Sequence, residues 1–127
     1  MKRDIVHTDK APAAIGPYSQ ATRCGGFVFT AMQIAIDPDT DQLVGAATAE
    51  QAHRCLRNLQ TVLEAADSSL AGALKVTVYL RDMEAFAAVN AVYEDFFPAD
   101  PPARAVVEVS ALPKGALVGV EAIAIAH

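Results

Sequence analysis

The spacing of the apolar residues between positions 48 and 80 constrains the fold more than any other feature of this sequence. In residues 73–80, ALKVTVYL, apolar side chains alternate with polar ones, which predicts a strand with Leu74, Val76, Val78 and Leu80 on one face. Just before it, apolar residues recur every three or four positions, as on one face of a helix: Ala52, Cys55, Leu56, Leu59, Val62, Leu63 and Ala66. A helix and a strand that are each apolar on one face bury those faces together, so we expect a two-layer fold.

The remaining elements follow from the same patterns. Thr48 and Gln51 have the spacing of a capping box, which predicts the start of the first helix. A second helix is expected after the capping residue Asp82, ending at Pro98; its stripe is Met83, Phe86, Val89, Asn90, Tyr93 and Phe97. Further strands are predicted at residues 4–8, on both sides of a Gly25-Gly26 hairpin turn with the second continuing to residue 36, and at residues 103–110 and 116–126.

This order, β-β-β-α-β-α-β-β, predicts an α+β protein in which two helices pack on one face of a mixed sheet. The 127 residues fit one domain, residues 1–127. Hydrophobic residues make up 53% of the chain and the mean hydropathy is +0.25, a value that favours burial of apolar surface against other copies. Because both faces of residues 117–126 are apolar or small, we expect the face away from the helices to meet another subunit.

Composition excludes several functional classes. The net charge of −5 and the scattered basic residues argue against nucleic acid as a partner. Cys24 and Cys55 have neither CxxC spacing nor further cysteines around them, and the three histidines show no metal spacing, so no disulfide framework, metal or cofactor is expected. The absence of a signal-like or membrane-spanning apolar segment predicts a cytoplasmic protein that does not bind membranes.

One arginine stands apart in the stretch PPARAVVEV, residues 101–109. Arg104 enters an apolar strand directly after two prolines and an alanine. A guanidinium at such a position must meet water or an anion, because burying it unpaired is costly. The anion is either a ligand or a carboxylate in a subunit interface, for which Glu108 and Glu121 are the candidates.

Four stretches, APAAIGPYSQA, FAAVNAVYEDFF, PPARAVVEV and LPKG followed by EAIAI, together closely resemble the RidA/YjgF family across nearly the whole chain. These are reactive-intermediate deaminases that were once called translation inhibitors or L-PSP ribonucleases. The resemblance implies a chorismate-mutase-like fold assembled as a homotrimer, with ligand clefts between neighbouring subunits.

The resemblance also implies roles for individual residues. Arg104 matches the arginine that holds the carboxylate of a 2-imino or 2-enamino acid, which suits a guanidinium able to form two parallel hydrogen bonds. Tyr18 matches a residue that lines the cleft, and Asn90 matches another near the ligand. For Asn90 a hydrogen bond from the helix to a loop is an equally good interpretation.

The sequence departs from the family pattern at several of these positions. Gly119 stands where active members usually carry a glutamate thought to position or activate water, whereas Glu121 matches a second, structural glutamate. Ala31 and Met32 replace a hydroxyl residue and a glycine that lie beside the ligand, and Val106 replaces a cysteine. A methionine side chain fills space that a small residue leaves open, so an altered pocket is expected.

Two functions remain open at this point. The first is hydrolytic deamination of reactive 2-imino or 2-enamino acids to 2-keto acids and ammonia, with Arg104 as the residue that binds the small carboxylate substrate. The alternative, favoured by Gly119 and Met32, is a trimer that binds small carboxylates or metabolites without converting them. Ribonuclease activity is disfavoured by the negative charge and by the lack of a His or Lys constellation.

Overall fold

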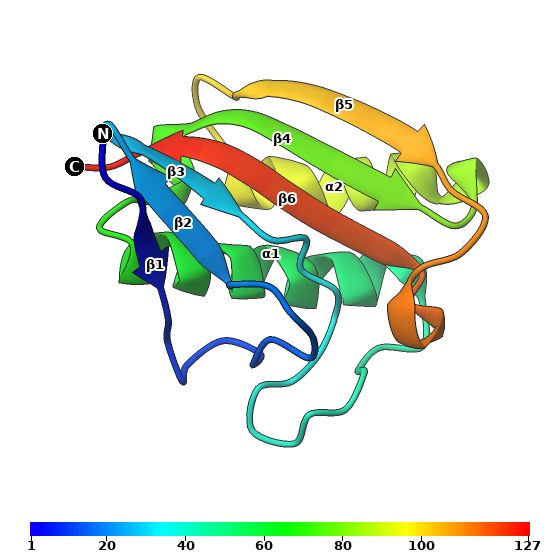
Figure 1. The fold of residues 1–127 in the computed structure, drawn as a ribbon. Coiled ribbons are helices and arrows are strands. Elements are labelled where there is room, and N and C mark those ends of the chain that lie inside the picture. The colour runs from blue at the N-terminus through cyan, green and yellow to red at the C-terminus, as the bar shows by residue number, and fades with distance from the viewer.

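Six strands form one mixed sheet in the computed structural model, which describes residues 1–127 (Figure 1). The strands are β1 (Asp4–Val6), β2 (Ala21–Cys24), β3 (Phe27–Thr30), β4 (Ala73–Leu80), β5 (Ala103–Glu108) and β6 (Val118–Ile125). The helices are α1 (Thr48–Ala65) and α2 (Phe86–Phe96), with 3-10 turns η1 (Leu70–Gly72), η2 (Met83–Ala85) and η3 (Pro113–Gly115). The predicted α+β class and element order are confirmed.

The strand order in the sheet is β1-β2-β3-β6-β4-β5. Neighbours run antiparallel except β4 and β5, which are parallel and are joined through α2. Gly25 and Gly26 both have positive φ, 57° and 84°, as a tight turn between β2 and β3 requires. The predicted hairpin is therefore confirmed, and β5 forms the edge of the sheet farthest from it.

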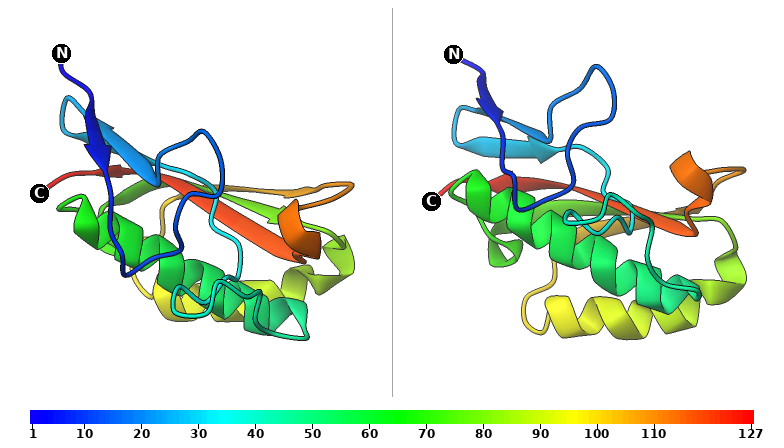
Figure 2. Two further views of the ribbon diagram at one scale, coloured as in Figure 1. Left: turned by 60° about the horizontal axis from the view of Figure 1, so that its bottom comes forward. Right: turned by 90° about the horizontal axis from the view of Figure 1, so that it is seen from below.

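Both helices cover the same face of the sheet, which leaves the opposite face open (Figure 2). Every residue of the predicted α1 stripe is buried. These side chains pack against the inward residues of two central strands, which are Val76, Val78 and Leu80 of β4 and Val118, Val120, Ala122 and Ala124 of β6. The core thus lies between one helix layer and the centre of the sheet.

The start of α1 differs from the prediction. Ala47 is the N-cap residue and no side chain caps the helix, so the capping box at Thr48 and Gln51 is wrong. The Gln51 amide instead donates to the Gly45 carbonyl at 3.0 Å and accepts from the Leu117 amide at 2.9 Å. Because the Gln51 side chain is buried, its amide needs partners on both sides, and these tertiary bonds take precedence over capping.

Two strand predictions also need correction. β3 ends at Thr30 rather than at residue 36, because the Thr30 hydroxyl accepts the Ala122 amide at 3.0 Å in place of a backbone carbonyl. Beyond it the chain makes one isolated bridge to the sheet, between Gln33 and Val120. The prediction that Leu74 lies on the buried face of β4 is wrong, because a register shift between Ala73 and Lys75 leaves it 43% exposed.

The open face of the sheet carries an apolar cluster across β3 and β6. Phe27 lies opposite Ile125, and Phe29 lies opposite Ile123. All four side chains are at least one third exposed. We refer to Phe27, Phe29, Ile123 and Ile125 as the open-face cluster; that it meets another subunit stays a prediction.

Candidate ligand site

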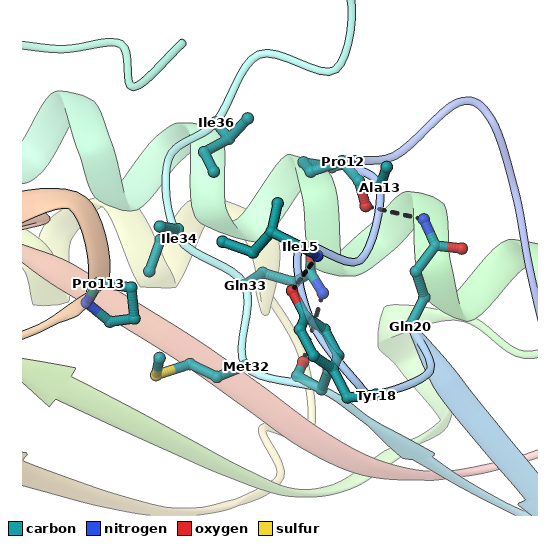
Figure 3. A pocket seen from close by; sticks show the side chains of 11 residues that line it. Pro12, Ala13, Ile15, Tyr18, Gln20, Met32, Gln33, Ile34, Ile36 and Pro113 are labelled. Carbon is teal, nitrogen blue, oxygen red and sulfur yellow. Dashed lines mark hydrogen bonds between the residues drawn. The ribbon is translucent and has the colours of Figure 1, made fainter. Parts of the chain in front are cut away.

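A pocket of about 370 Å³ lies between the β1–β2 loop and the segment that follows β3 (Figure 3). Three of the residues expected at the ligand site, Tyr18, Ala31 and Met32, line it. The other lining residues are Pro12, Ala13, Ile15, Gln20, Gln33, Ile34, Ile36 and Pro113. The pocket therefore combines a loop rich in proline and alanine with the irregular chain that leaves β3 early.

The polar groups around this pocket are largely occupied by the protein itself. The Gln20 side chain accepts from the Thr8 amide at 2.8 Å and donates to the Pro12 carbonyl at 2.8 Å, which holds the loop in place. The Tyr18 hydroxyl accepts from the Ile15 amide at 3.3 Å (Figure 3). Since no charged side chain lines the pocket, its surface is mainly apolar.

Met32 and Gly119 pack directly against each other. A Cβ atom on Gly119 would lie 2.7 Å from Met32 Sδ and 3.0 Å from Met32 Cγ, which is too close for real atoms. Gly119 does not have a positive φ, so glycine is needed here for space rather than for backbone conformation. The two departures from the family pattern are thus a single packing feature, in which the thioether uses the room that a side chain at position 119 would need.

Arg104 lies against α2, together with Asn90. Its Nη1 donates to Asn90 Oδ1 at 2.7 Å. Its Cζ lies 4.7 Å from the ring centroid of Tyr93 and 5.6 Å from that of Phe86, both within cation–π range. Asn90 therefore bonds to Arg104 and not to a loop, and the guanidinium is held on one helix face by three side chains.

Arg104 makes no salt bridge within the chain. The two carboxylates considered as partners bond elsewhere, since Glu108 accepts from the Met83 amide at 2.8 Å and Glu121 accepts from the Tyr79 hydroxyl. The Arg104 side chain is exposed, so its remaining N–H groups are available to an anion.

A single chain does not bring Arg104 to Met32. Arg104 of β5 lies opposite Val76 of β4, and Gly119 of β6 lies opposite Tyr79 of β4. Val76 and Tyr79 are three residues apart along β4, and β5 and β6 flank that strand on opposite sides. These offsets amount to about 10 Å along the strands and about 10 Å across them. Arg104 also points to the helix side, whereas Gly119 and Met32 lie on the open side, so the expected site residues form two separate groups.

Sequence reasoning placed Phe86 and Tyr93 in the stripe of the second helix but did not assign either residue to the site around Arg104. Phe86, Asn90 and Tyr93 lie on one helix face because of their spacing. This spacing could have predicted that the three side chains contact Arg104 together. The Tyr93 hydroxyl is buried without a hydrogen-bond partner in the chain. Burial raises the pKa of Tyr93, and the nearby Arg104 opposes that shift.

Tyr79 and Glu121 form a second polar pair, on the open side of the sheet. The hydrogen bond from the Tyr79 hydroxyl to Glu121 Oε1, assisted by partial burial and the carboxylate charge, raises the pKa of Tyr79 to about 12. Side chains alternate between the two faces along β4 and β6, which places Tyr79 and Glu121 on the same face. The sequence alternation alone could therefore have predicted that both residues lie on the open side.

The chain holds few other groups suited to metal or nucleophilic chemistry. Burial raises the pKa of the Cys55 thiol, which keeps it protonated and unreactive in the core. No three His, Cys, Asp or Glu side chains are grouped as metal ligands would be. Neither helix has the length and apolar character that crossing a bilayer requires.

Comparison with known proteins decides the family. The family model described as Endoribonuclease L-PSP matches residues 8–126. The chain belongs to this family, the RidA/YjgF proteins. A RutC family protein from Pyrococcus abyssi is 48% identical over 124 residues, covering 98% of each chain. The mouse protein named 2-iminobutanoate/2-iminopropanoate deaminase is 43% identical over 123 residues, covering 97% of this chain and 91% of its own.

A solved structure agrees in fold. The crystal structure of E. coli TdcF with bound serine matches with a TM-score of 0.92 and 38% identity, covering 98% of this chain and 99% of that chain. The family fold expected from the sequence is therefore confirmed over the whole domain.

Proposed function

We propose that this protein hydrolyses reactive 2-imino and 2-enamino acids to 2-keto acids and ammonia. The observation that carries the proposal is Arg104, a guanidinium fixed by Asn90 and two aromatic rings and free of any carboxylate partner in the chain. Such a group is suited to bind a ligand carboxylate through two charge-assisted hydrogen bonds. Relatives named imine deaminases, such as the mouse protein, support the same reaction.

The complete site requires a neighbouring subunit. Because Arg104 and Met32 lie on opposite sides of the sheet in one chain, a ligand can contact both only if Arg104 comes from the next copy. The exposed open-face cluster provides apolar surface for such an assembly. A homotrimer with one cleft at each of its three interfaces satisfies this requirement.

The reaction then needs little beyond binding and orientation. Arg104 holds the carboxylate, and a 2-enamino acid first takes a proton at C3 to become the 2-imino acid. Water adds to C2 and gives one proton to the nitrogen; the hydroxyl so formed gives its proton to the same nitrogen as the C2–N bond breaks, which releases ammonia and the 2-keto acid. Since imines are already electrophilic, orienting the water and the substrate can supply useful acceleration without a strong base.

A second function is favoured by the interlocked Met32 and Gly119. This packing removes the carboxylate that could have activated water, while leaving the Arg104 group intact. A trimer of this kind binds small carboxylates as a sensor or protective partner without converting them. The bound serine in E. coli TdcF shows that a related protein holds a small amino acid.

The deciding experiment generates 2-iminobutanoate in place, from threonine with a dehydratase, and follows the release of 2-oxobutanoate with and without this protein. Faster release with the wild type but not with Arg104→Ala supports the deaminase. The matched control is Arg57→Ala, which removes an exposed arginine from the outer side of α1. No acceleration, with 2-oxobutanoate still bound through Arg104, supports the binding role.

A cytoplasmic location stays a prediction.

A further inference from the structure

The size of the pocket beside Met32 is informative about the substrate. At about 370 Å³ it falls within the range of cavities that hold ligands of drug size, roughly 300 to 1,000 Å³. Within one subunit, the methyl or ethyl group of a three- or four-carbon imino acid would leave most of this space empty. A larger substituent is needed to fill it and to displace its water.

The chemistry of the lining narrows the choice further. Ile15, Ile34 and Ile36 contribute branched aliphatic surface, and Pro12 and Pro113 lie on either side of them (Figure 3). The polar side chains of Gln20 and Tyr18 already bond to the loop. The third polar side chain, Gln33, donates from Nε2 to the Ala31 carbonyl at 3.4 Å. A charged substituent would therefore lose water without gaining a charged partner, whereas an apolar one is favoured.

Met32 contributes a flexible apolar wall to this pocket. It extends toward Pro113 in Figure 3, and it is accommodated because Gly119 has no side chain. A glutamate at position 119 would bring a carboxylate next to this space. Because the Met32 thioether lies where a glutamate side chain at position 119 would project, this part of the pocket is apolar. The flexible thioether also lets the pocket adapt its shape.

Building on the proposed function, we propose that this pocket receives the substrate side chain, that the substrates are 2-imino acids with bulky apolar side chains, and that Met32 determines this specificity. Removal of water from serine or threonine gives only three- and four-carbon imines. A bulky apolar 2-imino acid must instead come from oxidation of the amino acid, in which C2 transfers a hydride to an oxidised flavin or nicotinamide and the nitrogen loses a proton. The supplying reaction is thus an amino-acid oxidation.

The test compares imines made by one route. A broad-specificity amino-acid oxidase, with catalase present, generates the imines of leucine, phenylalanine and alanine, and the rate constant for 2-keto acid release is measured with and without the protein. We expect the leucine-derived imine to be favoured over the alanine-derived one by at least about tenfold, as for apolar pockets that discriminate by size. Equal acceleration of the leucine-derived and alanine-derived imines, or a preference for the alanine-derived one, would overturn the proposal.

Substitutions locate the preference. Ile15→Ser is expected to reduce the leucine-to-alanine ratio several-fold, whereas Ile5→Ser is not; the two residues are 58% and 57% exposed, and only Ile15 lines the pocket. Met32→Ser should lower the ratio and Met32→Leu should retain it, because a purely structural role would change both rate constants together. An unchanged ratio in Ile15→Ser and Met32→Ser would contradict the assignment of this pocket.

Calorimetry separates this inference from the proposed function. Wild-type protein is titrated with 4-methyl-2-oxopentanoate and with pyruvate, which carry the two side chains on unreactive products. A roughly tenfold tighter affinity for the former supports the pocket assignment even if no imine is hydrolysed faster. Equal affinities overturn the assignment and leave the role of Arg104 intact, whereas acceleration of no imine overturns only the deaminase.

Discussion

Met32 occupies the space into which a side chain at Gly119 would project, with its sulfur 2.7 Å from the position of a Cβ atom there. A side chain at position 119 therefore requires the Met32 side chain to move. Substitutions at either position must be interpreted as changes to the pair.

In the Gly119→Ala variant, the contact between position 119 and Met32 should be overpacked. The added methyl displaces the Met32 side chain toward the pocket, and we expect a loss of about 1 kcal/mol, because the thioether is flexible enough to move. Urea unfolding measures this loss, and Met32→Ala combined with Gly119→Ala should recover most of it. A single variant as stable as the wild type, with the pocket unchanged in a crystal structure, would contradict the packing described here.

Restoring the acid requires both changes. Gly119→Glu combined with Met32→Gly should raise imine hydrolysis by about 10²-fold if a positioned base becomes available, and Gly119→Glu alone should give less because Met32 obstructs it. The new carboxylate would share a side of the sheet with Glu121, and their repulsion raises its pKa. The measurement is the hydrolysis rate at saturating imine for the wild type and the variants. A double variant no faster than the wild type would show that the absence of a carboxylate at position 119 does not limit the reaction.

Arg104→Ala should abolish most carboxylate binding without changing assembly. Arg104 is exposed in the single chain, and the proposed cleft between subunits buries its pair with the ligand carboxylate. Removing one partner of such a buried pair costs about 2 to 5 kcal/mol, so the affinity for 2-oxobutanoate should fall at least about 30-fold. Arg104→Lys should recover only part of it, since lysine lacks the planar pair of donors. If Arg104→Ala instead dissociates the subunits while Arg57→Ala does not, Arg104 stabilises the assembly rather than binding the ligand.

The open-face cluster should hold the assembly together. Light scattering is expected to give about three times the chain mass of 13.4 kDa. Ile123→Lys places a charge within the cluster, opposite Phe29, and should produce monomers. A wild-type monomer at micromolar concentration would remove the shared cleft, and with it the site proposed above.

The Tyr79 and Glu121 pair predicts a loss of stability in alkaline solution. The pKa of Tyr79 is raised from 10.0 to about 12 in the folded chain, so its contribution is complete below pH 10 and is lost as the pH rises from 10 to 12. Urea unfolding across this range should show that loss in the wild type and a smaller one in Tyr79→Phe. An identical pH dependence in the two proteins would mean that the hydrogen bond contributes nothing.

Much of the fold follows from local patterns in the sequence. The stripe of α1 and the alternation of β4 predicted both elements and their buried sides, because helical and strand periodicities are properties of neighbouring residues. The resemblance to the RidA/YjgF family, confirmed by comparison, singled out Tyr18, Met32, Arg104 and Gly119 one position at a time. Their spatial relationships were not part of that pattern.

Those relationships depend on contacts between distant segments. The end of β3 depends on Ala122, and the partners of Gln51 include Leu117, 66 residues away. The dependence of Met32 on Gly119 arises only where the chain beyond β3 crosses β6, and the separation of Arg104 from that point follows from strand order. Sequence periodicity reports which face of an element is buried; which distant side chains then share a space is decided when the elements pack.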